Sequence, residues 1–536
     1  MIPLHVHSYY SILSGTISPD AIVQKAKKFG LKSIALTDTN GMYGLVPFFK
    51  KATEEGINPV LGAHITDLEN EKKYALILAK NQQGYSELCK IITMRKLNED
   101  FSLVKVLNEY TENLFTITPS LDLLRRIKVH SNLFSELIST KNQKKSTREL
   151  YNFSLERRIP YIASNPIYFL NKEDHKLHRL VRSIDLNKAI NNLSENEVVD
   201  EECYFKDPGD IDNLYSSLPH AIKNTEKIAS NCKLDLKIGE LKYPKYPLGG
   251  EESAKDFLTK LTYNGLHKKY EKITEEILER VEYELSVINE LHFNDYFLIV
   301  WEIVKEAKRR GMLTIGRGSA ANSIVAYLLD LTQVDPIKHN LYFERFLNKA
   351  RKSPPDVDID FSWKERDEIV RFVFERYGYE CVAMISTHVT FKARSAFRET
   401  AKAFGIPDRE ISKYSKYIPW TSATNLPGVA QIFPEAKNVN FNVEPWKSIV
   451  KYASLLADFP RHLSIHPGGI VITPTKVTDY CALEYAKNKG LGLIITQPDM
   501  YSIEDLGLIK IDLLSQRSLG VLRDTVNMVD KNYSAE

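Results

Sequence analysis

The decisive stretch of this sequence is Pro355-Asp356-Val357-Asp358-Ile359-Asp360-Phe361, in which acidic and apolar residues alternate strictly. A period of two predicts a β-strand with its carboxylates on one face and its apolar side chains on the other. Same-face neighbours on a strand lie roughly 6.5–7 Å apart, and carboxylates at that spacing can converge on two divalent cations about 3.5–4 Å apart. Without metal such acids repel one another. For an isolated Asp-x-Asp, a solvated sheet face is the alternative.

A glycine-rich segment lies upstream, with the sequence Ile315-Gly316-Arg317-Gly318-Ser319-Ala320-Ala321-Asn322-Ser323. It leads into an apolar helical pattern that includes Ile324 and Leu328. Glycine lets backbone N–H groups approach a ligand, and a helix N-terminus adds positive potential, so this segment can cradle phosphate. Arg317 can add a charge-assisted contact. The segment lacks the spacing of a P-loop or a dinucleotide fingerprint, and a helix start that needs glycine for its geometry is the alternative.

A second strand is predicted downstream, over Leu508-Ile509-Lys510-Ile511-Asp512-Leu513-Leu514. Its apolar residues alternate with Lys510 and Asp512. If this strand lies beside the first, Asp512 supplies a further carboxylate and Lys510 can neutralise phosphate. Taken alone, the segment is equally typical of an ordinary amphipathic strand.

Together these segments resemble the palm of the bacterial C-family DNA polymerases, the family of the DNA polymerase III alpha subunit. Six segments carry the resemblance in the family's order: Asp295–Val300, Gly316–Ser319, Phe343–Asn348, Pro355–Phe361, His466–Gly469 and Gly507–Leu514. The variants Ser319–Ser323 and Pro354-Pro355-Asp356 are most similar to the error-prone branch.

The resemblance implies a DNA-templated DNA polymerase that transfers nucleotides with two Mg²⁺ ions in the palm, on primer–template DNA and dNTPs. Carried onto this chain, the catalytic and metal-ligating carboxylates are Asp358, Asp360 and Asp512. The residues expected to bind the nucleotide are Gly316, Arg317, Gly318, Ser319 and Lys510.

The start of the chain carries a second resemblance. His5-Val6-His7-Ser8 and Leu36-Thr37-Asp38 are similar to the PHP domain that opens these polymerases, and His-x-His on a strand is a sensible start for a metal cluster. Several positions depart from the family's ligands: Ser14, Thr39, His64, Pro166 and Tyr168. We therefore expect a degenerate site of His5, His7, Asp38 and His64, without a multinuclear metal cluster or exonuclease activity. His175 and His178 are expected on one packed face of a helix.

Charge and composition limit the functions further. The net charge of +3 means that nucleic acid must be bound by local basic surface and not by bulk charge. Lys392, Arg394 and Arg398, interleaved with aromatic residues, are the predicted DNA contacts; a helical bundle with an aromatic core is the alternative. The five cysteines show no C-x-x-C spacing. With no signal-peptide pattern and no apolar run long enough for a bilayer, we expect a cytoplasmic protein without membrane contact.

The predicted organisation is an α/β multidomain chain. Residues 1–235 form a PHP-type distorted barrel, 236–251 a linker, 252–390 the first part of a nucleotidyltransferase-like palm, 391–460 a small helical thumb, and 461–536 the second part of the palm. The family continues into fingers and C-terminal modules that these residues lack, so we expect a truncated or split polymerase, with a separately encoded C-terminal half as a further partner. A non-catalytic remnant that binds DNA or a partner, and a PHP-type metal phosphoesterase, remain open as alternatives.

Overall fold

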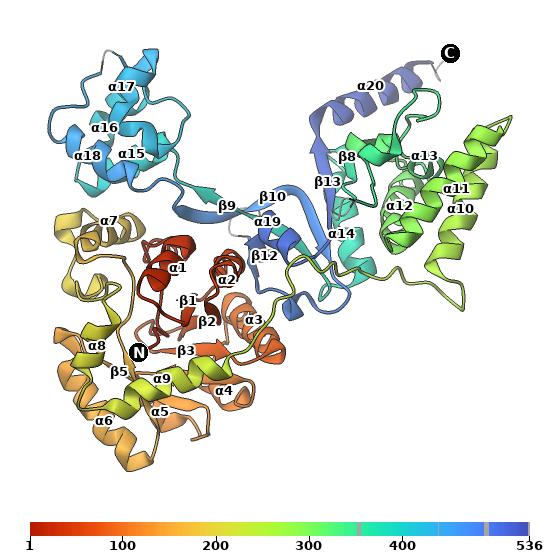
Figure 1. Ribbon diagram of the computed structural model, residues 1–536. Helices are drawn as coiled ribbons and strands as arrows, with labels where there is room; N and C mark the ends of the chain where they lie inside the picture. Colours follow the sequence, from red (N-terminus) through yellow and green to blue (C-terminus); the bar gives the residue numbers. More distant parts are fainter. Residues whose placement is uncertain (351–354, 438, 487–492, 534–536) are drawn as a thin grey trace.

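The computed structural model describes residues 1–350, 355–437, 439–486 and 493–533, so Pro354 of the error-prone-type variant lies outside the described residues. Figure 1 shows three parts: a barrel-like N-terminal domain, a mixed sheet with helices, and a small helical domain held away from that sheet by two long strands. The expected α/β multidomain fold is thereby confirmed. Within the described ranges, no helix has both the length and the apolar composition that a membrane crossing requires.

The N-terminal sheet has six strands in sequential order. Neighbouring strands pair in parallel except around β3, which is antiparallel to both of its neighbours. The segment that follows Met1 closes the barrel, because Thr37 N donates to Val6 O on one side and His7 N donates to Ile167 O on the other. The strands are β1 (Ser33–Thr39), β2 (Asn58–Thr66), β3 (Tyr74–Ala79), β4 (Leu114–Thr118), β5 (Leu133–Ile138) and β6 (Tyr161–Ser164).

Helices wrap this sheet on the outside (Figure 1). Most begin at a side-chain N-cap; in α1, for example, Ser18 accepts a hydrogen bond from Ala21 N. The helices are α1 (Pro19–Lys28), α2 (Leu45–Glu54), α3 (Gln82–Leu97), α4 (Leu103–Glu109), α5 (Leu121–Arg126), α6 (Lys144–Arg157), α7 (His175–Leu186), α8 (Pro208–Leu214) and α9 (Pro219–Asn231).

The palm sheet has seven strands in the order β11-β12-β9-β10-β13-β8-β7. The two strands predicted from alternation, β8 and β13, are direct parallel neighbours, and β7 pairs antiparallel with β8 at the edge of the sheet. The strands are β7 (Thr314–Arg317), β8 (Asp358–Ser362), β9 (Val382–Thr390), β10 (Pro460–Ile472), β11 (Leu483–Tyr485), β12 (Ile494–Asp499) and β13 (Lys510–Gln516).

Helices on the palm sheet bury the apolar faces of β8 and β13. Val357, Ile359 and Phe361 lie in one hydrophobic core with the helical residues Tyr296 and Phe297. The Tyr296 hydroxyl also accepts a hydrogen bond from Val357 N at 3.2 Å, which fixes the entry to β8. The helices are α10 (Ala254–Lys269), α11 (Glu275–Glu290), α12 (Asn294–Arg309), α13 (Ile324–Leu328), α14 (Arg366–Tyr377), α19 (Met500–Asp505) and α20 (Arg517–Tyr533).

The small helical domain is carried by the long strands β9 and β10 (Figure 1). Phe391 and Phe397 are two of the aromatic residues that interleave with the predicted DNA contacts. Both are buried in the core of this domain, and Phe397 stacks on Trp446. Trp420, by contrast, is 90% exposed. The aromatic residues therefore divide between a packed core and the surface. The helices are α15 (Ala393–Ala403), α16 (Asp408–Ser415), α17 (Val429–Ile432) and α18 (Trp446–Ser454).

The barrel and the palm share a continuous interface. Buried apolar residues of the palm, such as Leu483 and Ile503, belong to the same core as α2 and α3. Polar contacts reinforce it, since the Tyr43 hydroxyl donates to Glu484 at 2.5 Å. The irregular segment between α9 and α10 also runs along the palm, and at Gly507, with φ +73°, a Cβ atom would lie 1.9 Å from Glu240 O. Only glycine fits this approach.

Candidate active site

The palm site is built on the pairing of β8 with β13. Asp512 lies directly opposite Asp358 in the parallel register, so both carboxylates project from the same face of the sheet. On the other side of β13, Gly469 of β10 is the partner of Asp512. Asp358, Asp512 and Asp356, which lies just before β8, each offer a carboxylate oxygen, and these oxygens all lie within 4.8 Å of one another.

Asp360, which the sequence predicts as a metal ligand beside Asp358 and Asp512, is not one of this group of three. On β13 the residue opposite Asp360 is Leu514, so Asp360 has no acid across from it as Asp358 has Asp512. The Asp360 carboxylate instead accepts a hydrogen bond from Gln516 at 3.3 Å and lies 3.4 Å from the Arg317 guanidinium. Asp356 takes the third position, although it is the most exposed of these acids.

The electrostatics of the group follow from its crowding. Burial, together with the charges of Asp356 and Asp512, raises the pKa of Asp358 to about 6. Lys510 Nζ lies 2.7 Å from one oxygen of Asp512, and although burial opposes the lysine's charge, this bond raises the pKa of Lys510. The other oxygen of Asp512, Oδ1, is buried and has no hydrogen-bond partner.

The predicted nucleotide loop borders this group. At Gly316 a Cβ atom would lie 1.8 Å from Leu331 O, and Gly318 has φ +74° with Asp358 Oδ2 only 3.5 Å from the place of its Cβ. Both positions therefore need glycine, one for close approach and one for its backbone conformation. Arg317 is paired with Asp358 across β7 and β8, and its side chain lies over Asp358 and Asp360.

The helix after this loop differs from the sequence expectation. α13 has five residues, and its first amides are already satisfied: Ile324 N and Val325 N donate to the Glu284 carboxylate, and Ala326 N donates to Ser323. Its N-terminus is thus not free to hold phosphate. Glu284 is fully buried in α11 and also pairs with Arg280 at 2.7 Å. Its hydrogen bonds to the start of α13 therefore hold the end of the loop against α11.

The His466–Gly469 motif forms a bulge in β10. The pairing with β9 shifts register between Ile465 and Ile470, and His466 Nδ1 accepts a hydrogen bond from Gly469 N at 2.6 Å inside the bulge. A Cβ atom at Gly468 would lie 2.5 Å from the Leu514 side chain. The bulge therefore lets β10 meet β13 closely beside Asp512.

The palm acids suit a hard divalent cation. Mg²⁺ is held through oxygen ligands, often one or two carboxylates together with substrate phosphates. The group offers three carboxylates within reach of one point. Asp512 Oδ1, which is buried without a hydrogen bond and lies 3.7 Å from His466 Nδ1, is a polar atom that a cation would satisfy.

A second cluster lies inside the barrel. His5, His7 and His64 are buried, and their ring nitrogens lie within 4.8 Å of one another. His5 Nδ1 is 2.6 Å from Glu136, and His7 Nδ1 is 2.8 Å from the Ser11 hydroxyl, as for metal-binding histidines oriented by a second partner. Burial lowers the pKa of His7 and of His64, which keeps both rings neutral. His64 Nε2 has no partner.

The other predicted PHP positions are otherwise engaged. Asp38 accepts hydrogen bonds from Ser8 N, the Ser8 hydroxyl and the Ser11 hydroxyl, each at 2.7 Å, so it lies outside the three-histidine cluster. The Tyr168 ring stacks on His7 with 4.0 Å between ring centroids. His178 Nδ1 is hydrogen-bonded to Ser14 O, and His178 Nε2 accepts a hydrogen bond from Val199 N. His178 and His175 both lie in α7, as predicted for a packed helical face.

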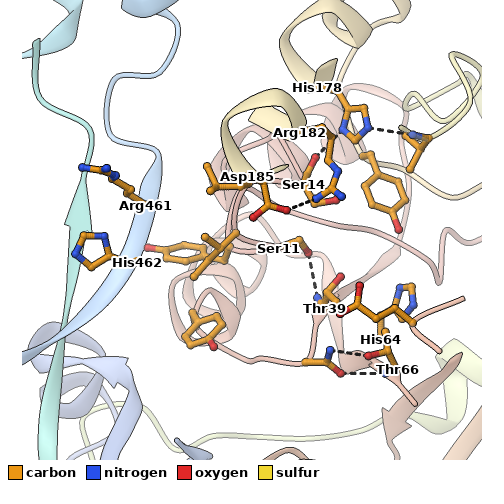
Figure 2. A pocket seen from close by; sticks show the side chains of 18 of the residues that line it. Ser11, Ser14, Thr39, His64, Thr66, His178, Arg182, Asp185, Arg461 and His462 are labelled. Atoms are coloured by element: carbon orange, nitrogen blue, oxygen red, sulfur yellow. Dashed lines mark hydrogen bonds and ion pairs between the residues drawn. The ribbon is translucent and has the colours of Figure 1, made fainter. Parts of the chain in front are cut away.

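A cavity of about 620 Å³ opens beside the three-histidine cluster. Figure 2 shows His64 and Thr39 on its barrel side and Arg461 and His462 on β10 across from them, and all four residues line it. Arg182, which is paired with Asp185 at 2.5 Å, adds a cation to its wall. The cavity is therefore shared between the barrel and the strand that leads to the helical domain.

The predicted DNA contacts are partly committed to holding the helical domain together. The Arg394 guanidinium donates to Ile418 O at 2.6 Å. Arg398 donates to Ser415 at 3.1 Å and lies 3.3 Å from Asp408. Lys392 is exposed at the start of α15. Of the three, Lys392 is the one whose side chain is turned to solvent without such a contact.

Four site residues were missed by sequence reasoning. Asp356 shares the alternation of β8 and could have been included from that pattern alone. Glu284, Glu136 and Gln516 act through contacts between segments far apart in the chain, for which a single sequence carries no signal.

Two family matches divide the chain in the same way as the fold. The PHP domain family matches residues 3–157, and the family described as the bacterial DNA polymerase III alpha NTPase domain matches residues 256–515. A barrel of this kind followed by a palm with paired carboxylates defines a polymerase-type chain.

Curated relatives point to the same family. The DNA polymerase III subunit alpha of Bacillus subtilis is 33% identical over 99% of this chain and 49% of its own length, and an error-prone DNA polymerase of Symbiobacterium thermophilum is 32% identical over 98% and 52%. Among solved structures, the match to an amidohydrolase from Chromobacterium violaceum covers 31% of this chain and 87% of the amidohydrolase chain, at 12% identity. Its TM-score of 0.21 is too low to indicate a shared fold.

The chain belongs to the family of bacterial DNA polymerase III alpha subunits, over its PHP and palm parts. It spans about half the length of the curated relatives that it matches. Relatives named DNA polymerase III subunit alpha and a relative named error-prone DNA polymerase match this chain at nearly equal identity.

Proposed function

We propose that this chain is the PHP, palm and thumb part of a DNA-templated DNA polymerase. The proposed PHP domain is 1–235, the linker 236–251, the palm 252–390 together with 461–536, and the thumb 391–460. The observation that carries the proposal is the register that sets Asp358 opposite Asp512, with Asp356 within reach and the Gly316–Ser319 loop alongside. No such grouping is needed for folding, because aligned acids destabilise a sheet that holds no cation.

Asp358 and Asp512, joined by Asp356 and by Asp360 once it leaves Arg317, would hold the two Mg²⁺ ions. When bound, these ions would activate the primer 3′-hydroxyl and stabilise the leaving pyrophosphate. The backbone at Gly318 and Ser319 would bind the triphosphate, with Arg317 and Lys510 as its cationic partners. Primer–template DNA and dNTPs would be the substrates.

A prediction about DNA tests the helical domain as a thumb. Primer–template duplex should bind weakly and without sequence preference, with a log–log salt slope of about −4 to −5 if roughly 4–6 phosphates are contacted. Lys392 and Lys416 are both exposed and flank the same loop, which Arg394 holds through Ile418. Replacing both lysines by alanine should flatten the slope by about two units, one for each lost contact.

Fluorescence anisotropy across a salt series measures this slope. The matched control is Lys476→Ala, which removes a lysine that is paired with Glu380 and lies outside residues 391–460 of the helical domain. An unchanged slope in the double variant, or a slope near zero in the wild type, would mean that the helical domain does not bind the DNA backbone and is a packed bundle with a structural role.

A second prediction concerns metal in the barrel. Because His5, His7 and His64 form one compact group while Asp38 is engaged by serines, the barrel should hold at most one tightly bound transition-metal ion per chain. It should not show 3′–5′ exonuclease activity. Any bound ion should be lost on His7→Ala, whereas His175→Ala, outside the cluster, should leave the content unchanged.

Elemental analysis of the purified protein by mass spectrometry gives the metal content. Two or more ions per chain that depend on His7 would contradict the prediction and would favour a PHP-type phosphoesterase as the function of the barrel. Nuclease activity that is lost with His7→Ala would do the same.

A further inference from the structure

The palm acids are not free in the structure, because two cations hold them. Lys510 Nζ lies 2.7 Å from Asp512 Oδ2 and 3.8 Å from Asp356. Arg317 Nε lies 3.4 Å from Asp360 Oδ1 and 3.9 Å from Asp358 Oδ2. Each cation thus bridges two carboxylates, and together they contact all four acids of the site.

We propose that Arg317 and Lys510 stand in for metal while the site is without substrate, and release the acids to metal only when a polyphosphate draws them away, so that metal and triphosphate binding are coupled. This inference rests on the proposed function and deepens it. It assigns to these two residues a role in ordering the binding events, in addition to their contact with the nucleotide.

The charge of the site supports the coupling. Four carboxylates and two cations leave a net charge of minus two among these side chains, which one divalent ion neutralises. A second divalent ion would make the group positive unless a polyanion arrives with it or the two cations leave. Because the side chains of Asp360 and Asp512 are almost fully buried, such an excess charge is poorly screened.

The ligand atoms support it as well. The hydrogen bond from Lys510 occupies Asp512 Oδ2 and leaves Oδ1 as a buried oxygen without a hydrogen-bond partner, 3.7 Å from His466 Nδ1. One cation can bind there while Lys510 stays, but full use of Asp512 requires the lysine to move. Arg317 likewise holds one oxygen of Asp360, so full use of Asp360 as a metal ligand requires the arginine to move. Its side chain is half-exposed and can turn toward a ligand on the Gly318 side of the loop.

The coupling predicts effects of opposite sign in one variant. Lys510→Met removes a like charge close to the metal and frees Asp512 Oδ2, so the Asp358-dependent binding of Mn²⁺ alone should become about three- to tenfold tighter. The same variant has lost a charge-assisted phosphate contact, so a fluorescent dNTP at saturating Mn²⁺ should bind at least about fivefold more weakly. A role for Lys510 in packing alone would not strengthen metal binding.

Mn²⁺ binding is measured by the loss of the free-ion signal in electron paramagnetic resonance, and dNTP binding by fluorescence anisotropy. Each metal titration is compared with the same protein carrying Asp358→Asn, which removes the contribution of sites elsewhere, the three histidines included. Arg317→Met is the second variant, because its half-exposed side chain makes a folding defect less of a concern than at Lys510. Lys476→Met is the matched control, since it removes a lysine bound to a carboxylate away from the site.

The inference stands if both site variants bind Mn²⁺ more tightly and the dNTP more weakly than the wild type, while the control changes neither. Weaker Mn²⁺ binding in both variants, with Asp358-dependent binding in the wild type, would overturn the coupling and leave the proposed function intact. Absence of dNTP binding to the wild type at saturating Mn²⁺ would also overturn the coupling. If no Mn²⁺ binding depends on Asp358, the proposed metal site itself fails, and the coupling fails with it.

Discussion

Replacing Asp358 by asparagine is expected to lower nucleotide incorporation by at least about 1000-fold, or about 4 kcal/mol of transition-state stabilisation. Asp358 lies opposite Asp512 on β13 and opposite Arg317 on β7, and its Oδ2 is 3.5 Å from the place that a Cβ atom of Gly318 would take. Asparagine keeps the size of the side chain and removes its charge, so the loss reports on metal binding and not on folding. The result is read from primer extension with Mg²⁺ or Mn²⁺.

The assay is run on the chain alone and, if that is inactive, with a partner polypeptide that supplies the rest of the relatives' length. Asp100→Asn is the matched control, because it makes the same chemical change at an exposed position in the barrel. Incorporation at the wild-type rate in Asp358→Asn would show that Asp358 is not one of the catalytic carboxylates.

Replacing Glu284 by alanine should cause the largest loss of local stability in the palm, about 3 kcal/mol. The carboxylate is fully buried and accepts hydrogen bonds from the Ser323 hydroxyl, Ile324 N and Val325 N, and it pairs with Arg280. Its removal leaves Nε of Arg280 and two helix amides without partners, while the other end of the guanidinium keeps its bonds to Asn322 O and Leu341 O. Breaking such a buried pair typically costs several kcal/mol.

Hydrogen exchange read by mass spectrometry measures this local opening directly. Amides in residues 318–328 should exchange about 100-fold faster in Glu284→Ala, because each 1.4 kcal/mol corresponds to a factor of ten. Glu282→Ala, an exposed glutamate on the same helix, should leave exchange unchanged. Equal protection of residues 318–328 in Glu284→Ala and the wild type would mean that the loop does not depend on the buried carboxylate.

The strands of the palm site were predictable because their side-chain period is two. Alternation alone predicted β8 and β13, and the alternating acids showed which face would carry charge. The pairing of Asp358 with Asp512 then required only that the two strands be neighbours, which the resemblance to a known palm supplied and the register bears out.

The choice between Asp356 and Asp360 could not be made from the same pattern. Both share a face with Asp358, and what separates them is which residue of β13 lies opposite and which cation lies nearby. Both features are set by pairing between separate segments, β8 with β13 on one side and β8 with β7 on the other. Carrying the family's residues over favoured Asp360, whereas the geometry without a ligand favours Asp356.

Two further features depend on packing that a single sequence does not reveal. The loop before α13 looked like a free helix start, but Glu284 from α11 already caps it. In the helical domain, basic and aromatic residues interleave along the chain, yet Phe397 is buried and Trp420 is exposed, because helix packing and not composition decides which aromatics reach solvent.

The central claim is that the palm carboxylates form a divalent-cation site. The most direct test is the anomalous difference map of a crystal of this protein grown with Mn²⁺. We expect a peak within about 2.5 Å of carboxylate oxygens from both Asp358 and Asp512, the range of oxygen ligands to such hard cations. A map with Mn²⁺ bound elsewhere in the protein and no peak between Asp358 and Asp512 would contradict the account.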